Sequence, residues 1–216
     1  MSIIKKVTII DYGLGNLLSV SRAIEKCGAK PFITDNCKDV VQSDYLILPG
    51  VGNFSIAIEE LRKRGLEDAI LDYSLKERPL LGICLGMQML LDTSEEQGFH
   101  SGLGIISGSV KAIPKNNEKG IRNKIPHIGW APLSIDARTK IGDKLELEKN
   151  FSGKFFYFIH SFQGHTDNPE ECIAITKYNN LNITAIIQKK YAIGCQFHPE
   201  KSGKNGIDFL KNFMGI

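Results

Sequence analysis

Short apolar runs alternate with amphipathic stretches through the first half of the chain, and this alternation predicts buried strands separated by helices. Four runs are rich in β-branched residues or leucine and are bounded by Gly, Pro or Asp. They are Val7–Ile10, Pro31–Thr34, Tyr45–Leu48 and Leu80–Cys84. Continuous apolar runs of this length are typical of a parallel sheet that is covered on both faces. We therefore expect helices on both faces of this sheet.

The intervening segments have the periodicity of helices that bury one face. Residues 17–27 place Leu, Val, Ile and Cys at helical spacing before Gly28, which favours a helix end. Residues 54–61 repeat the pattern with Phe, Ile and Leu, and Gly65 ends it. A further amphipathic stretch follows up to Lys76. This order of strands and helices is that of an α/β protein with a parallel sheet.

The second half of the chain changes to strand-like segments joined by short turns, which predicts antiparallel strands added to the sheet. These segments are Ser109–Ile113, Gly129–Ile135, Phe155–His160, Cys172–Tyr178, Ile183–Gln188 and Ile193–Phe197. Ile207, Leu210 and Met214 have helical spacing and predict a closing helix. No repeat or long linker divides the chain, so we expect one domain over residues 1–216 with a mixed, mainly parallel sheet.

Composition and charge narrow the classes of function. Of the 216 residues, 42% are hydrophobic and 24% are charged, which is typical of a globular protein and excludes a disordered chain. The net charge of +3 favours neither nucleic acid nor an anionic membrane as a partner. No apolar run approaches the ~20 residues of a membrane span, and the run before Asp11 is too short for a secretory leader. Five scattered cysteines without a CxxC pair argue against a disulfide framework, so we expect a cytoplasmic protein.

The segment Gly82–Gly86 (GICLG) is the strongest chemical signal, because it follows an apolar strand and precedes a helical stretch. It is a cysteine version of the G-x-S-x-G nucleophile elbow, in which a sharp turn lifts the nucleophile out of the sheet. The start of the next helix would favour a Cys84 thiolate, and the N–H of Leu85 would be placed to bind an oxyanion. Taken alone, the pentapeptide fits a small buried cysteine in a glycine-rich turn equally well.

A thiol nucleophile needs a base, and His198 is the best candidate among the five histidines. It follows an apolar strand, and Glu200 can turn back toward its ring. In such a set the carboxylate would orient the ring, and the ring would activate the Cys84 sulfur. On its own, His198 also fits an ordinary hydrogen-bonded turn residue. His127 and His160 have no carboxylate close to them in sequence and are weaker candidates.

The segment Pro49–Phe54 (PGVGNF) follows the third strand and carries a glycine on each side of Val51. Glycine allows unusual backbone angles, so this loop can turn its N–H groups inward. Sites of α/β proteins form at the carboxyl ends of strands, so the loop and the Cys84 turn should meet at one crevice. The loop could then supply a second oxyanion donor; otherwise it is a surface turn without a ligand.

Two other kinds of site are disfavoured. The segment Asp11–Asn16 (DYGLGN) starts like a dinucleotide-binding loop, but Leu18 stands where the third glycine is required. No spacing of histidines, cysteines or carboxylates matches a metal site. We therefore expect neither a cofactor nor a metal.

Together the motifs resemble the class I (triad) glutamine amidotransferases, and among them the glutaminase subunits of imidazole glycerol phosphate synthases. The resemblance covers nearly the whole chain. It rests on DYGLGNLLS at 11–19, PGVGNF at 49–54, GICLGMQ at 82–88, SEE at 94–96, PHIGW at 126–130, YFIHSF at 157–162 and QFHPEKS at 196–202. It implies a three-layer, flavodoxin-like fold. It also implies a heterodimer in which glutamine is hydrolysed and the ammonia passes to a (β/α)₈-barrel cyclase of histidine biosynthesis.

The resemblance further implies roles for individual residues. Cys84 would be the nucleophile, with His198 and Glu200 completing the triad. The oxyanion site would be formed by Leu85, Val51 and Gly52, and the glutamine pocket by Gly50, Gln88, Glu96, Ser161 and Phe162. Asn16 and Lys201 match positions near the partner interface and the ammonia entrance. Without the resemblance, Gln88 and Glu96 would be taken as polar residues at an exposed helix end.

Two departures from the family pattern concern the ammonia acceptor. Ala131 stands where the family usually has Asn, and Phe162 stands where it often has Tyr, on strands that are expected to face the partner. A close alternative is therefore the same glutaminase chemistry supplying ammonia for amidino groups on bacterial surface sugars. A catalytically idle scaffold, a stand-alone cysteine hydrolase and a sulfur-redox protein are further alternatives.

Overall fold

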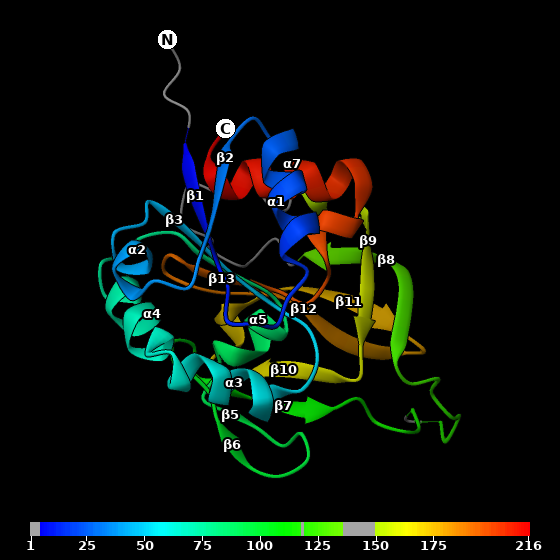
Figure 1. The fold of residues 1–216 in the computed structure, drawn as a ribbon. Helices are drawn as coiled ribbons and strands as arrows, with labels where there is room; N and C mark the ends of the chain where they lie inside the picture. The colour runs from blue at the N-terminus through cyan, green and yellow to red at the C-terminus, as the bar shows by residue number, and fades with distance from the viewer. Residues whose placement is uncertain (1–4, 118, 136–149) are drawn as a thin grey trace.

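The computed structural model describes residues 5–117, 119–135 and 150–216, which form a large sheet, a small sheet and flanking helices (Figure 1). The strands of the large sheet are β1 (Lys6–Ile10), β2 (Lys30–Thr34), β3 (Tyr45–Gly50), β4 (Leu80–Cys84), β8 (His127–Ile135), β9 (Phe155–His160), β11 (Cys172–Tyr178), β12 (Leu181–Lys189) and β13 (Ala192–Cys195). Their order is β2-β1-β3-β4-β13-β12-β11-β8-β9. The strands from β2 to β13 run parallel, and β12, β11, β8 and β9 each pair antiparallel with the preceding strand in this order. The parallel part has the flavodoxin-like order, so the predicted fold class is confirmed.

A second, four-stranded sheet differs from the prediction. Its strands are β5 (Thr93–Ser94), β6 (His100–Ser101), β7 (Gly108–Ala112) and β10 (Phe162–Thr166), in the order β10-β7-β5-β6. The expectation that the segment 109–113 extends the large sheet is therefore wrong. Strands β5 and β6 have two residues each, too few to show a period, and β10 follows β9 after Ser161 alone, without a turn signal.

Helices cover both faces of the large sheet, as predicted. They are α1 (Leu17–Lys26), α2 (Cys37–Val41), α3 (Phe54–Lys63), α4 (Leu66–Ser74), α5 (Leu85–Met89) and α7 (Gly203–Met214), with short 3₁₀ helices η1 (Pro169–Glu171) and η2 (Pro199–Lys201). Helices α1 and α7 lie on one face, and α2 to α5 lie on the other (Figure 1). The sequence pattern does not single out α2, because five residues are too few to show helical spacing. Within the described part of the chain, no helix is long and apolar enough to cross a membrane.

Consecutive residues of the parallel strands supply two separate cores. In β3, Ile47 packs into the core beneath α1 and α7, whereas Leu46 and Leu48 pack into the core beneath α3 and α4. All three side chains are fully buried. Alternate side chains of a strand point to opposite faces, so a sheet that is covered twice needs apolar residues at every position. This explains the continuous apolar runs of β1, β3 and β4, whereas β2 lies at the edge of the sheet and is mostly not buried.

The carboxyl ends of β3, β4 and β13 lie next to one another and place the candidate chemistry. Gly50 at the end of β3 is the register partner of Cys84 at the end of β4. Cys195 at the end of β13 is the partner of Ile83. The predicted last strand thus ends at Cys195 rather than Phe197. The segments that leave these three strands emerge together at one edge of the sheet.

Candidate active site

Cys84 ends β4 in a strained backbone conformation, with φ 54° and ψ −108°. A residue other than glycine rarely adopts a positive φ, and such strain clusters at functional turns. The flanking glycines make this turn possible. A Cβ on Gly86 would lie 1.9 Å from the carbonyl oxygen of Leu48, and a Cβ on Gly82 would lie 2.7 Å from the carbonyl of Gly86. The turn therefore requires glycine on both sides of Cys84, as the elbow motif predicts.

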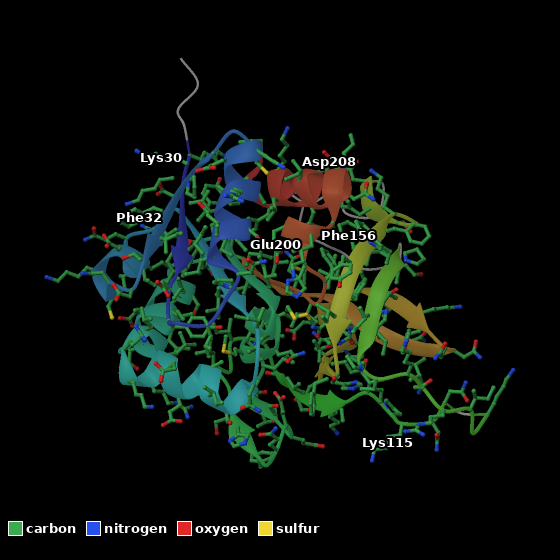
Figure 2. The ribbon with its side chains drawn as sticks, turned by 45° about the vertical axis from the view of Figure 1, so that its right-hand side comes forward. Lys30, Phe32, Lys115, Phe156, Glu200 and Asp208 are labelled. Atoms are coloured by element: carbon green, nitrogen blue, oxygen red, sulfur yellow. The ribbon has the colours of Figure 1, made fainter. Side chains whose placement is uncertain are left out.

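His198 lies beside Cys84 and forms a buried pair with Glu200. The ring Nδ1 of His198 lies 2.8 Å from Glu200 Oε1, and the two side chains are 3% and 1% exposed. Burial lowers the pKa of His198, but hydrogen bonds to Cys84 and Glu200 outweigh burial and raise it to about 10. The ring is therefore protonated at neutral pH and presents a positive charge to the sulfur. Figure 2 shows Glu200 in the interior of the molecule, between α1 and β9.

A cavity of about 350 Å³ opens beside the Cys84 sulfur. The predicted site residues that line it are Val51, Gly52, Cys84, Leu85, Gln88, Glu96, Ser161, Phe162, His198 and Lys201. Three predicted residues lie outside the lining: Gly50 beneath it, Glu200 behind His198, and Asn16 at the start of α1. A larger cavity of about 430 Å³ lies at the opposite edge of the sheet, but its lining holds neither a cysteine nor a histidine.

The glycine loop after β3 packs directly against the Cys84 turn. A Cβ on Gly50 would lie 2.8 Å from the backbone nitrogen of Gly86 and 2.9 Å from the hydroxyl of Tyr12. The fully buried Tyr12 donates from Oη to the carbonyl of Pro49 at 2.8 Å. Burial and the nearby Cys84 raise the pKa of Tyr12, so its hydroxyl remains a donor. The prediction that the loop and the elbow meet at one crevice is confirmed, whereas sequence reasoning missed the role of Tyr12.

Two buried glutamines connect the cavity wall to the sulfur. Gln88 Nε2 donates to the carbonyl of Phe162 and to Gln196 Oε1, both at 3.0 Å. Gln196 Nε2 in turn donates to Cys84 Sγ at 3.7 Å. Gln88 is 4% exposed, so its alternative interpretation as an exposed residue is wrong. From the sequence, Gln196 is only the first residue of the QFHPEKS segment, because no neighbouring residue indicates that its side chain faces the Cys84 sulfur.

Glu96 lies in the loop after β5 and contacts the start of α3. Its Oε2 accepts a hydrogen bond from the backbone N–H of Phe54 at 2.9 Å. The first N–H groups of a helix have no partner within the helix, so a carboxylate here both satisfies a donor and faces a favourable dipole. Glu96 also lines the cavity, so this contact fixes its carboxylate at the cavity wall.

A buried histidine pair borders the same cavity and was not predicted. His160 lines the cavity, and its Nε2 lies 3.1 Å from Nδ1 of His127. Its own Nδ1 lies 2.8 Å from the carbonyl of Phe162, which can only accept, so Nδ1 carries the hydrogen. Burial lowers the pKa of His160 to about 3 and that of His127 to about 4. Both rings are therefore neutral, and they brace the wall of the cavity.

An exposed apolar face lies on β8 and β9 beside the cavity. Its side chains include Ile128 and Trp130, each 54% exposed, and Phe155 and Ile159, 51% and 39% exposed. Ile159 also lines the cavity, so this face adjoins the cavity directly. Ala131 is only 6% exposed and packs in the core. The departure from the family pattern at Ala131 therefore lies in the core and not on this exposed face.

Comparisons with known proteins agree with this geometry. The family model described as glutamine amidotransferase class-I matches residues 8–215. PurLQS from Thermotoga maritima has a similar structure, with a TM-score of 0.72 at 16% identity over 99% of both chains. A crystal structure of a glutamine amidotransferase gives a TM-score of 0.70 at 16% identity, over 97% of this chain and 99% of that one. At this identity the structures support the fold alone, and the family match shows that the chain belongs to the class I glutamine amidotransferases.

Curated relatives show to which group of class I glutamine amidotransferases the chain is similar in sequence. Imidazole glycerol phosphate synthase subunit HisH 1 of Legionella pneumophila (strain Lens) is 39% identical over 210 residues, covering 97% of this chain and 99% of that protein. Subunit HisH of Geobacillus sp. (strain WCH70) is 41% identical over 210 residues, covering 97% and 96%. Within the class, the chain falls in the HisH group, and the resemblance seen in the sequence is confirmed.

Proposed function

We propose that this chain is the glutaminase subunit of an imidazole glycerol phosphate synthase. It hydrolyses glutamine to glutamate and ammonia and passes the ammonia to a cyclase of histidine biosynthesis. The cyclase then makes imidazole glycerol phosphate and an aminoimidazole carboxamide ribotide. The strained Cys84 at the wall of a cavity, with the buried His198–Glu200 pair beside it, is the observation that carries this proposal. The HisH relatives support the choice of pathway.

The first half of the reaction releases ammonia. The Cys84 thiolate attacks the side-chain amide carbon of glutamine, and the carbonyl electron pair moves onto oxygen. The N–H of Leu85 and an N–H of the Val51–Gly52 segment hold this oxyanion. Protonated His198 then gives its Nε2 proton to the amide nitrogen, the C–N bond breaks, and ammonia leaves. A glutamyl thioester remains on the sulfur.

The second half restores the enzyme. Water attacks the thioester carbonyl and gives a proton to the neutral ring of His198. The C–S bond breaks, the new carboxylic acid loses its proton to water and leaves as glutamate, and a thiolate beside a protonated ring is formed again. Glu200 keeps the ring in one orientation through both halves, since its carboxylate accepts from Nδ1.

The cavity wall supplies groups for the amino acid end of glutamine. The two N–H bonds of Gln88 Nε2 already donate to Phe162 and Gln196. The Oε1 atom of Gln88 is left to accept hydrogen bonds from N–H groups of the substrate. The carboxylate of Glu96 offers a charge for the α-ammonium group. The backbone of Ser161 and Phe162 completes the cavity wall. Hydrogen bonds within the protein already hold the side chains of Gln88 and Glu96 in position, so glutamine binding costs little side-chain entropy.

Ammonia must reach its acceptor without meeting bulk water, where it is protonated and loses its nucleophilicity. The exposed apolar face on β8 and β9 suits a partner subunit, because its aromatic and aliphatic side chains exclude water when covered. Ile159 belongs both to this face and to the cavity lining, so the cavity lies beside the face, and Lys201 lines the same cavity. We propose that a (β/α)₈-barrel cyclase docks here and that Asn16 lies near the interface. The free thiols of all five cysteines fit the reducing cytoplasm.

A chloroketone analogue of glutamine tests the nucleophile in the complex with the cyclase of the same organism. We expect peptide-resolved mass spectrometry to find the label on Cys84 and glutamine to protect against it. Cys84→Ser is the control and should remain unlabelled. Labelling that ignores glutamine, or that falls on other cysteines while sparing Cys84, would overturn the proposal.

A further inference from the structure

Gln196 directly follows β13 and has a fully buried side chain beside the nucleophile. Its Nε2 lies 3.7 Å from Cys84 Sγ, within hydrogen-bonding distance of a sulfur. Its backbone N–H donates to the carbonyl of Ala185 on β12 at 2.9 Å, which fixes the main chain at this point. The side chain therefore reaches the sulfur from an anchored position on the sheet.

The orientation of the Gln196 amide follows from its other partner. Gln88 Nε2 donates to Gln196 Oε1 at 3.0 Å and to the carbonyl of Phe162 at 3.0 Å. Since an NH₂ group can only donate and a carbonyl can only accept, Gln88 itself cannot be reversed. Gln196 must then direct its oxygen to Gln88 and its NH₂ group to the sulfur. A flipped Gln196 would set two donors against each other.

The local sequence explains why Gln196 and His198 act on the same atom. They are two residues apart on the segment that leaves β13, so their side chains project to the same side. Phe197 between them packs in the core, with its ring 4.2 Å from that of Phe156. The backbone N–H of His198 donates to the carbonyl of Tyr157 at 2.9 Å and holds the segment in place.

We propose that Gln196 is a further catalytic residue, whose amide N–H donates to the Cys84 sulfur and stabilises its thiolate. This inference rests on the proposed role of Cys84 as the nucleophile. His198 loses its proton to ammonia in each turnover, so its ring is neutral while the thioester exists. The amide of Gln196 does not titrate, so its N–H remains directed at the sulfur throughout the cycle. Gln196 therefore supplies a constant donor to the sulfur, whereas the positive charge of His198 is absent until the attacking water returns a proton to the ring.

The pH dependence of alkylation tests this donor on the whole chain. Native protein, Gln196→Met and the control Gln188→Met are treated with iodoacetamide from pH 5 to pH 10, and Cys84 is followed by peptide mass spectrometry. Gln188 donates to the carbonyl of Lys190, away from the cavity. We expect the pH midpoint of alkylation to rise by about one unit in Gln196→Met, with an unchanged plateau at high pH. Coincident midpoints for Gln196→Met and native protein would overturn the proposal.

Gln196→Glu keeps the experiment decisive if Gln196→Met does not fold. It preserves the shape of the side chain and an acceptor for Gln88, but it replaces the N–H donor with a carboxylate that repels the thiolate. We expect a larger upward movement of the midpoint than about one unit. An unchanged midpoint in this variant would refute the donor. Alkylation does not require glutamine hydrolysis, so this result is independent of whether the native complex proves to be a glutaminase.

Discussion

The Tyr12 hydroxyl offers a sharp test of how the glycine loop is positioned. Tyr12→Phe removes only the hydrogen bond to the Pro49 carbonyl, which spans 2.8 Å at a fully buried side chain. Leaving one buried carbonyl without its partner costs roughly 1–3 kcal/mol. The ring itself stays packed in the core, so the fold should survive.

The kinetic effect should exceed what a loss of stability explains, because Pro49 lies only two residues before Val51, the first residue of the proposed oxyanion segment. Loss of one oxyanion donor typically lowers kcat by about 100- to 1,000-fold. A displaced loop keeps part of that contact, so we expect kcat to fall about 10- to 100-fold in Tyr12→Phe. Glutamine turnover by the complex measures kcat, and urea unfolding measures stability.

Tyr73→Phe is the matched control. Tyr73 is also fully buried, and it donates to the carbonyl of Pro79 at 2.9 Å, before the start of β4 and away from the cavity. We expect a similar loss of stability with a normal kcat. A normal kcat in Tyr12→Phe as well would refute the argument that Tyr12 positions the loop.

Two further predictions concern the histidines. Glu200→Gln removes the carboxylate that helps raise the pKa of His198 against burial, so kcat should fall by about 100-fold or more with little change in KM. An unaffected kcat would remove Glu200 from the mechanism. His127→Phe removes a ring whose pKa burial lowers to about 4. The unfolded ring takes a proton near pH 6.5, so the stability that the neutral ring contributes is full above that pH and is lost as the pH falls toward 4. From pH 7 to pH 5 the native chain should therefore lose about 2 kcal/mol more than the variant in urea unfolding, and parallel stability curves would contradict this.

The elbow was predictable from sequence because its geometry is encoded in neighbouring residues. Gly82 and Gly86 flank Cys84 within five positions, and each glycine is required by a close backbone contact. The pairing of His198 with Glu200 is similarly local, since they are two residues apart. The continuous apolar runs of the parallel strands encode burial on both faces, so the main sheet was predictable as well.

Contacts between distant segments could not be predicted, because they depend on strand register and on side-chain direction. His127 and His160 meet because they are register partners on β8 and β9. Gln196 reaches Cys84 only because β13 pairs beside β4. The small sheet was predicted only in part: the segment of β7 was expected to be a strand, but β5 and β6 have two residues each and show no period.

Cys84→Ala in the complex with the cyclase shows whether the sulfur of Cys84 releases the ammonia. We expect synthesis of imidazole glycerol phosphate from glutamine to be lost, while synthesis from added ammonium salts continues at the native rate. Glutamine-dependent synthesis that persists in the variant would show that the sulfur is unnecessary for releasing ammonia, and Cys84 would not be the nucleophile.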